Sequence, residues 1–365
     1  MIHEKVYQVA LSLVPGIGDV LVKQLISHFG SAGKVFHLSK GKLALIPRVG
    51  KKMAGLDLGR ILRQAESMLG SARSQGILPL FYLDKDYPRR LKQVQSAPPL
   101  IWYKGSPAYN SKKIISIVGT RRATSYGKSI VRELISGLKK HKVAIVSGLA
   151  YGIDIEAHRR ALEEDLPTIA VIAGGHDQIY PPEHRKEVFR MLENGGVLSE
   201  QCWGTLPEAH HFPRRNRIIA GLSDATVVIE AASKGGALIT AEYAYSYDRD
   251  IFAVPGNLDQ RYSLGCNLLI ENLKANIYTG VESLEKILNW DLKPGKQIVN
   301  YEEVEKLSPE EIAILEILEE KRSGLAIQEL SWRSQVSLNQ LASILLNLEF
   351  KGIVRSLPGN HYKIN

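Results

Sequence analysis

Short β-branched segments alternate with helical segments between residues 77 and 290, and this alternation limits the possible folds more than any other feature. Five segments have the composition of buried strands, at residues 114–118, 144–147, 168–173, 226–230 and 251–254. Strands that alternate with helices predict a parallel sheet with crossover helices, which is a fold of the α/β class. Glycines follow four of the strands, at Gly119, Gly148, Gly174-Gly175 and Gly256. Because ligands bind beyond the carboxyl ends of such strands, we expect these turns to line a binding site.

The preceding segment, residues 1–75, has the pattern of a small helical domain of the SAM or helix-hairpin-helix type. It contains two glycine turns, at residues 14–18 and 46–52. In a helix-hairpin-helix unit such a turn brings backbone N–H groups close to a phosphate at a helix N-terminus. Packing of short helices would produce the same pattern, so both interpretations remain open.

The final segment, residues 305–365, has the pattern of a winged helix and follows an expected linker at 291–304. Ser308-Pro309-Glu310-Glu311 predicts a helix start with serine as the N-cap. Helices are expected at 310–321, 327–334 and 338–351, and a two-stranded wing at 353–363. Residues 337–349, most of the third helix, contain no cation, and residues 298–365 carry seven Lys/Arg and ten Asp/Glu, a net charge of −3. We therefore interpret this domain as a protein-contact module.

The charge of the whole chain indicates an anionic partner. Its 365 residues carry a formal net charge of +9, which favours nucleic acid. The two cysteines, Cys202 and Cys266, form no CxxC pair, which argues against a disulfide framework or a cysteine-based zinc site. No apolar run approaches the ~20 residues of a membrane span, and the N-terminus lacks a signal-peptide profile. We expect a soluble, cytoplasmic protein without a membrane partner.

A basic cluster at residues 210–221 is the strongest candidate for an anion site. Arg214, Arg215 and Arg217 occupy three of four successive positions around Asn216, and Phe212 precedes them. The planar fork of arginine matches phosphate oxygens two at a time, and an aromatic ring offers a base a surface for stacking. A solvated basic turn is the alternative interpretation.

Two glycine turns after the first predicted strands are candidate phosphate seats. Gly119-Thr120-Arg121-Arg122 fails the Walker A spacing, but it precedes a helix expected near Ser125. The turn at Gly148 leads into Asp154 and His158, which lie four residues apart on one helical face. An acid–base pair, or a metal site with His176, Asp177 or His210, is one interpretation. We favour a structural interpretation, in which Asp154 is the N-cap of the helix and a neighbouring side chain forms a hydrogen bond with it.

A third turn, Lys234-Gly235-Gly236, opens a helix that carries Thr240 and Glu242. It resembles the phosphate loop of nucleotide-monophosphate phosphoribohydrolases, but Ala237 and Leu238 depart from that pattern. Anion binding is therefore expected without catalysis, metal or cofactor. An enzyme of that phosphoribohydrolase-like type, or a small-nucleotide sensor that uses the 235–242 loop, is the alternative function.

Seven motifs occur in an order that resembles the DNA-processing protein A (DprA/Smf) family. They are Gly119-Thr120-Arg121, Ser147-Gly148-x-Ala150-x-Gly152-Ile153-Asp154-x-x-Ala157-His158, Gly174-Gly175-x-Asp177-x-x-Tyr180-Pro181, Leu198-Ser199-Glu200, Phe212-Pro213-x-Arg215-Asn216-Arg217, Leu238-Ile239-Thr240-Ala241 and Ala253-Val254-Pro255-Gly256. The match covers residues 110–280. Where the family commonly has Ser-Gly-Ser before the sixth motif, this chain has Gly235-Gly236-Ala237.

The resemblance implies a non-enzymatic protein that binds single-stranded DNA in a basic pocket and self-associates through its Rossmann-like domain. It also implies delivery of the RecA recombinase to incoming DNA during natural transformation. The family's pocket would use Arg121, Phe212, Arg215, Asn216 and Arg217, and charge and position add Arg122, Arg214 and Lys234.

Each pocket residue has an expected role. We expect Arg121 and Arg217 to clamp phosphates, Phe212 to stack a base, and Asn216 to fix the loop or contact a base edge. The glycine loops, through Gly119, Thr120, Gly148, Gly235, Gly236 and Thr240, would seat phosphate. Replacing Phe212, Arg215 and Arg217 together by alanine is expected to abolish binding and leave the fold intact.

Overall fold

Nine strands in the described part of the chain form one sheet, in the order β1-β2-β6-β5-β4-β3-β7-β8-β9. The computed structural model describes residues 3–46, 50, 53, 55–290, 307–320, 324–357 and 359–364. From β6 to β9 in that order the strands are parallel, whereas β1 and β2 pair antiparallel beside β6. The strands are β1 Leu78–Phe81, β2 Leu100–Gly105, β3 Ile114–Val118, β4 Ala144–Ser147, β5 Thr168–Ile172, β6 Gly195–Ser199, β7 Ala225–Val228, β8 Asp250–Ala253 and β9 Asn276–Ile277.

All five strands predicted from composition are present, and they correspond to β3, β4, β5, β7 and β8. Strand β6 was not predicted because it begins with Gly195-Gly196, and glycine is depleted in strands. Both glycines are required by close neighbours. A Cβ atom on Gly195 would lie 2.1 Å from the Thr168 carbonyl oxygen, and one on Gly196 would lie 2.2 Å from the Lys104 carbonyl oxygen.

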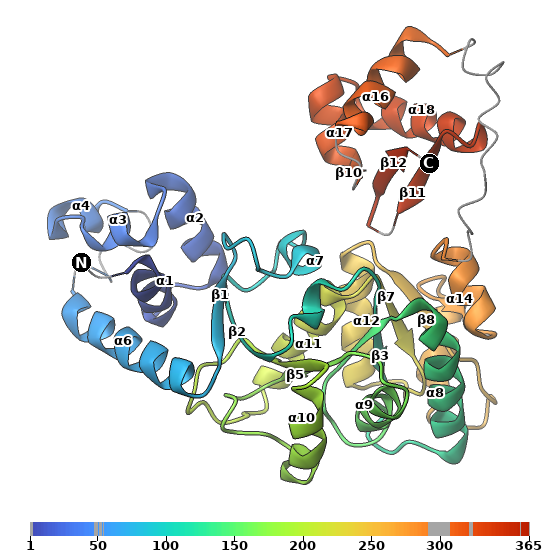
Figure 1. Cartoon of the computed structure of the whole chain (residues 1–365), viewed down its shortest axis with the longest axis horizontal. Helices are drawn as coiled ribbons and strands as arrows, with labels where there is room; N and C mark the ends of the chain where they lie inside the picture. Colours follow the sequence, from blue (N-terminus) through green and yellow to red (C-terminus); the bar gives the residue numbers. More distant parts are fainter. Residues whose placement is uncertain are drawn as a thin grey trace.

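Helices cover both faces of the sheet (Figure 1). The core on one face joins the sheet to α7 Arg89–Lys92, α11 His211–Leu222, α12 Gly236–Ser246 and α13 Leu264–Glu271. The cores on the other face join it to α8 Ser125–Leu138, α9 Ile153–Glu163, α10 Arg185–Met191 and α14 Val281–Ile287. Short 3₁₀ turns lie at Ala108–Asn110, Lys139–His141 and Pro182–His184. Successive side chains of a strand point to opposite faces of the sheet. Because helices cover both faces, the central strands are buried on both sides.

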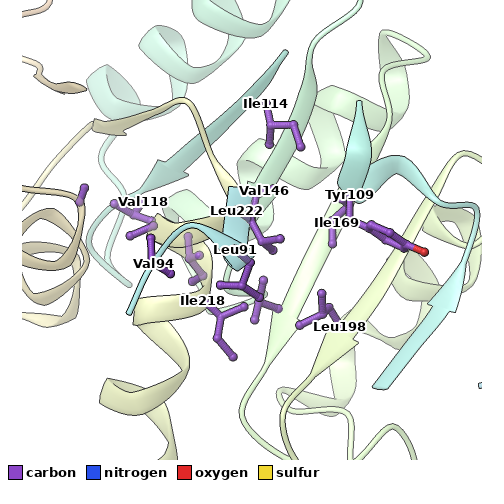
Figure 2. Packing of buried hydrophobic residues seen from close by; sticks show 14 of the residues in the cluster. Leu91, Val94, Tyr109, Ile114, Val118, Val146, Ile169, Leu198, Ile218 and Leu222 are labelled. Carbon is purple, nitrogen blue, oxygen red and sulfur yellow. The ribbon is translucent and has the colours of Figure 1, made fainter. Parts of the chain in front are cut away.

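Helix α11 is held firmly against the sheet by its apolar side. Figure 2 shows this packing, with Ile218 and Leu222 of α11 among Leu91, Val94, Val146, Ile169 and Leu198. Ile218 and Leu222 are completely buried. The N-terminal part of the helix, which contains Phe212 and the arginines, is therefore attached to a rigid support.

The strand order changes direction next to β3. Strands β4, β5 and β6 are added one after another on one side of β3, and the chain then returns through α11 to place β7 on the other side. Such a switch point opens a crevice beyond the carboxyl ends of the two central strands, here β3 and β7.

The N-terminal segment forms a helical lobe with its own apolar core, next to β1 and β2 (Figure 1). Its helices are α1 Glu4–Leu13, α2 Asp19–Phe29, α3 Ala32–Phe36, α4 Lys40–Ala44 and α6 Leu58–Ser74. The first predicted glycine turn joins α1 to α2, with Gly16 at φ +78° and Gly18 as the N-cap of α2. Most of the second turn, at 46–52, lies outside the described residues.

The C-terminal lobe is a winged helix, as predicted. It contains α16 Pro309–Glu319, α17 Ile327–Ser334 and α18 Leu338–Phe350, and a sheet in the order β10-β12-β11. The strands are β10 Leu325–Ala326, β11 Val354–Leu357 and β12 His361–Ile364. The predicted cap of α16 is confirmed as a complete capping box between Ser308 and Glu311. The expected linker at 291–304 lies outside the described residues.

None of the helices in the described ranges is both long and apolar enough to cross a membrane.

Candidate functional site

A cavity of about 770 Å³ opens at the switch point of the sheet. Six segments contribute to its wall: the turn after β3, the β4–α9 turn, the loop after β5, the β6–α11 loop with the start of α11, the β7–α12 loop and the β8–α13 loop. Its charged and aromatic lining residues are Arg121, Asp154, Tyr180, Phe212, Arg215, Lys234, Arg261 and Tyr262. Gly119, Thr120, Asn216, Gly235, Gly236 and Thr240 also line it, so most of the predicted site residues meet in one place.

Phe212 lies at the centre of a group of cations and rings. The guanidinium carbons of Arg121 and Arg215 lie 5.7 Å and 5.9 Å from the centroid of its ring. The ring of Tyr180 meets it edge to face, with centroids 6.0 Å apart. Arg121 and Tyr180 are exposed and Phe212 is half-buried, so these groups are accessible to a ligand.

Arg215 forms part of the floor of the cavity. Its guanidinium donates hydrogen bonds to the carbonyl oxygens of Gly148 and Val171, and its Nε donates to Asn216 Oδ1 at 3.2 Å. Burial lowers the pKa of Arg215 to about 10, the Asp154 carboxylate opposes this shift, and Arg121 adds to it. Arg215 therefore remains charged at neutral pH while most of its donors are used by the protein. Gly148 lies behind it and does not line the cavity.

The structure corrects the predicted cap of α9. Gly152 is the N-cap, and Asp154 lies inside the first turn, where its Oδ2 accepts from the Ala150 N–H at 3.4 Å. Burial raises the pKa of Asp154, and the charge of Arg215 opposes that rise. His158 is not bonded to Asp154: its Nδ1 is 2.7 Å from Thr168 Oγ1, and its Nε2 has no hydrogen-bond partner among the described residues. Among the described residues no three His, Cys, Asp or Glu side chains are grouped as a metal site would require.

His158 makes the stability of the protein sensitive to acid. Burial, followed by the charges of His184 and Arg215, lowers its pKa to about 3. The unfolded chain takes up this proton near pH 6.5 and the folded chain does not, so the stability is complete above pH 6.5 and declines as the pH falls towards 3. Between pH 7 and 5 the loss should be roughly 2 kcal/mol for this histidine.

Urea denaturation at several pH values checks this expectation. His158→Gln should flatten the dependence of the unfolding free energy on pH between 7 and 5. Some slope should remain, because burial also lowers the pKa of His176 to about 4. Equal slopes for the parent protein and the variant would contradict the assignment to His158.

The β7–α12 loop supplies the second accessible cation and an open helix start. Lys234 is exposed, and Gly235 is the N-cap of α12 without a side-chain cap. Backbone N–H groups at a helix start favour anions. Asn216 Nδ2 donates to the Gly236 carbonyl oxygen at 3.1 Å, which joins α11 to this loop. Asn216 therefore fixes the loop, one of the two roles expected for it.

Three predicted DNA contacts do not line the cavity: Arg122, Arg214 and Arg217. Arg122 is exposed on the turn after β3, and Arg214 is half-exposed and pairs with Glu200 at 3.2 Å. These two cations therefore lie near the site without forming its wall.

Arg217 is a structural residue, which corrects the expectation that it clamps phosphate. Its side chain is 7% exposed and pairs with Glu200 at 2.6 Å and with Asp19 at 3.1 Å. It also donates to the Ser96 carbonyl oxygen. Asp19 begins α2, so Arg217 connects the pocket helix α11 to the N-terminal lobe. The helix start after the first glycine turn therefore faces the sheet domain and carries an acidic residue, Asp19. This arrangement supports helix packing, rather than phosphate binding, as the role of the turn.

Sequence reasoning did not identify Tyr180, Arg261 and Tyr262 as site residues, although all three line the cavity. Tyr180 was noted only as part of a motif. Arg261-Tyr262 pairs a cation with a ring in the loop that follows the predicted strand at 251–254. That combination at the carboxyl edge of the sheet was the available signal.

The fold and the site define a class of protein: a Rossmann-like α/β domain with a basic, aromatic-lined cleft, combined with a helical lobe and a winged helix. Residues 79–289 match the family model described as DNA recombination-mediator protein A, and residues 302–360 match the DprA winged helix domain. The chain belongs to the DNA recombination-mediator protein A (DprA/Smf) family. Its role is accordingly that of a DNA-processing recombination mediator.

Curated relatives resemble the chain over most of its length. Protein Smf of Synechocystis is 32% identical and covers 99% of this chain and 98% of its own length. DNA processing protein DprA of Bacillus subtilis is 35% identical over 74% of this chain and 92% of its own length.

Two solved structures agree with the fold. The X-ray structure of DprA from Streptococcus pneumoniae has a TM-score of 0.61 and 31% identity, and covers 78% of this chain and 97% of that chain. DNA processing protein A from Helicobacter pylori, whose structure concerns a single-stranded DNA binding mode, has a TM-score of 0.54 and 29% identity. That match covers 60% of this chain and 97% of the other chain.

Proposed function

We propose that this protein binds single-stranded DNA in the cavity at the switch point and helps load a RecA recombinase onto it, without catalysing a reaction. One observation carries the proposal: three cations without carboxylate partners in the described chain line the same cavity as three aromatic rings. The cations are Arg121, Lys234 and Arg261, and the rings are Tyr180, Phe212 and Tyr262. Proteins that bind single-stranded nucleic acid combine cations that contact the phosphate backbone with aromatic rings on which the bases stack.

An unpaired strand suits this cavity better than a duplex does. Bases in a duplex are stacked on each other, so their faces are not available to protein rings. In an unpaired strand, the ring of Phe212 contacts a base while Arg121 and Lys234 contact phosphates. The Helicobacter pylori relative, described for its binding of single-stranded DNA, supports the same ligand.

The carboxylates near the cavity argue for a non-catalytic role. Glu242, the acid of the phosphoribohydrolase-like loop, pairs with Lys274 at 2.7 Å and does not line the cavity. Asp154 is the one carboxylate among the described lining residues, and it is buried beside Arg215. A general acid or base must reach its substrate, and neither group is free to do so.

Self-association through the sheet domain is part of the proposal. Leu264 and Leu268, four residues apart on α13, are about two-fifths exposed, and Leu273 beyond the helix is 90% exposed. Apolar side chains gathered on one face favour a protein contact. Sedimentation equilibrium of the purified chain measures the expected dimer, and a monomer at micromolar concentration would oppose it.

Fluorescence anisotropy of labelled oligo-dT, with a matched duplex as the control, tests the DNA ligand. We expect a clear preference for the single strand, and a log–log salt slope of roughly −0.7 for each phosphate neutralised. Equal or negligible binding of both ligands would reject the proposal. Thermal stabilisation by mononucleotides but not by oligonucleotides would instead favour the small-nucleotide sensor.

A further inference from the structure

Arg261 and Tyr262 repeat, at another edge of the cavity, the combination found at Arg121 and Phe212. The Arg261 guanidinium carbon lies 5.8 Å from the centroid of the Tyr262 ring. Arg261 is exposed, Tyr262 is half-buried, and both line the cavity. In the described chain no carboxylate lies within ion-pair distance of Arg261. A cation left unpaired beside an accessible ring is available for a phosphate and its base.

The backbone holds this pair in place without a ligand. The Ala231 N–H donates to the Tyr262 carbonyl oxygen at 2.7 Å, and the Gly265 N–H donates to the Ala231 carbonyl oxygen at 2.8 Å. A Cβ atom on Gly265 would lie 2.4 Å from the Ala232 carbonyl oxygen, so only glycine permits this approach. The side chain of Asn267 also bonds Gly256, at 3.2 Å to its N–H and 2.9 Å to its carbonyl oxygen.

The two combinations stand beyond strands that are not neighbours in the sheet. Arg121 follows β3, whereas Arg261 and Tyr262 follow β8, and β7 lies between these strands. With strands roughly 4.8 Å apart, the carboxyl ends of β3 and β8 are separated by about 10 Å. A stacked nucleotide advances the strand by only ~3.4 Å. The span therefore corresponds to more than one nucleotide.

We infer that the cavity is a site for at least two nucleotides of one strand, with Arg121 and Phe212 holding one base and Arg261 and Tyr262 holding another. This inference rests on the proposed binding of single-stranded DNA. Tyr262 stacks the second base, and Arg261 contacts a phosphate next to it. The minimum ligand is accordingly an oligonucleotide rather than a mononucleotide.

Two thymidine hexamers distinguish this arrangement from a single-base site. One carries all its bases, and the other keeps one thymine in an otherwise abasic backbone, so both retain the phosphates. Tyr262→Ala should weaken the full hexamer by roughly 5- to 100-fold, which corresponds to one stacked base, and change the single-thymine hexamer by less than about twofold. Tyr262→Phe should bind both hexamers like the parent, because it keeps the ring.

Arg261→Ala should lower the steepness of the salt dependence by roughly 0.7 for the full hexamer, since one phosphate contact is lost. Arg132→Ala on α8 and Tyr245→Ala are matched controls, because both residues are exposed and neither lines the cavity. Both controls should bind like the parent.

The possible failures are distinguishable. If the parent bound neither hexamer, the proposed function itself would fail. If the parent bound the full hexamer and Tyr262→Ala bound it equally well, the inference alone would be wrong. Equal losses for both hexamers in Tyr262→Ala would also overturn the second stacking position, because the loss would then be independent of a second base.

Discussion

Replacing Arg121 and Phe212 together by alanine should lower the affinity for unstructured oligo-dT by at least about 50-fold. A stacked base contributes roughly 1–3 kcal/mol, and a charge-assisted hydrogen bond contributes about 1.5–3 kcal/mol. The two losses should combine because both side chains contact the same part of the ligand. The salt dependence should also become less steep by roughly 0.7 for the lost phosphate contact. Anisotropy titration at two or more salt concentrations measures both quantities.

The fold should tolerate this double variant. Arg121 is exposed and has no carboxylate partner among the described residues, and Phe212 is half-buried at the rim of the cavity. The thermal unfolding midpoint should therefore stay close to that of the parent. Arg132→Ala is the control, because it removes one exposed charge from α8 without changing the cavity wall. Unchanged affinity of the double variant would show that oligo-dT binds elsewhere.

Replacing Arg217 by alanine should destabilise the protein by about 3–5 kcal/mol, the usual cost of removing one partner from a buried ion pair. The variant leaves Glu200 largely buried without its strongest partner, and it leaves Asp19 of the N-terminal lobe without this contact. Urea denaturation followed by circular dichroism measures the change in the free energy of unfolding.

Arg214→Ala is the matched control for this variant. Arg214 also pairs with Glu200, but its side chain is 53% exposed, so its loss should cost no more than about 1 kcal/mol. Similar losses for the two variants would contradict the structural role of Arg217.

The cost of losing Arg217 should depend on pH. Burial raises the pKa of Glu200, and the charge of Arg217 opposes that rise. Without Arg217 the pKa should rise further, so that Glu200 takes up a proton in the folded state as the pH falls. A raised pKa in the folded state means that acid favours folding. The difference in stability between parent and variant should therefore be smaller at pH 5 than at pH 8.

The structural role of Arg217 makes the Arg121 and Phe212 double variant the better test of the pocket. The sequence alone suggested replacing Phe212, Arg215 and Arg217 together with the fold left intact. In the structure both arginines are buried and bonded, Arg215 to backbone oxygens and Arg217 to carboxylates. Their removal would unfold the pocket, and a loss of binding would then say nothing about contact with DNA.

Local signals in the sequence determined much of the fold. The predicted helix starts near Ser125 and at Ser308-Pro309 are correct, because capping depends on residues within one turn. The central strands were predicted because they are buried on both faces and so consist of continuous apolar runs. Strands β1 and β2 were missed because prolines and glycines weaken the pattern: Pro79 lies within β1, Pro98-Pro99 precedes β2, and β2 ends at Gly105.

The sequence by itself determined the class of fold, the order of the motifs and the place where the site lies, because periodicity, capping and glycine turns act over a few residues. Tertiary structure alone decided which cations face the ligand. Arg214, Arg215 and Arg217 look equivalent in the sequence, but successive positions on a helix point about 100° apart. Their partners come from distant segments: Glu200 and Asp19 for Arg217, and the ends of two strands for Arg215. In the same way, the order of the strands brings Arg261 and Tyr262 to the cavity. The turn after β3 and the loop after β8 are far apart in the chain, but both lie at the carboxyl edge of the sheet.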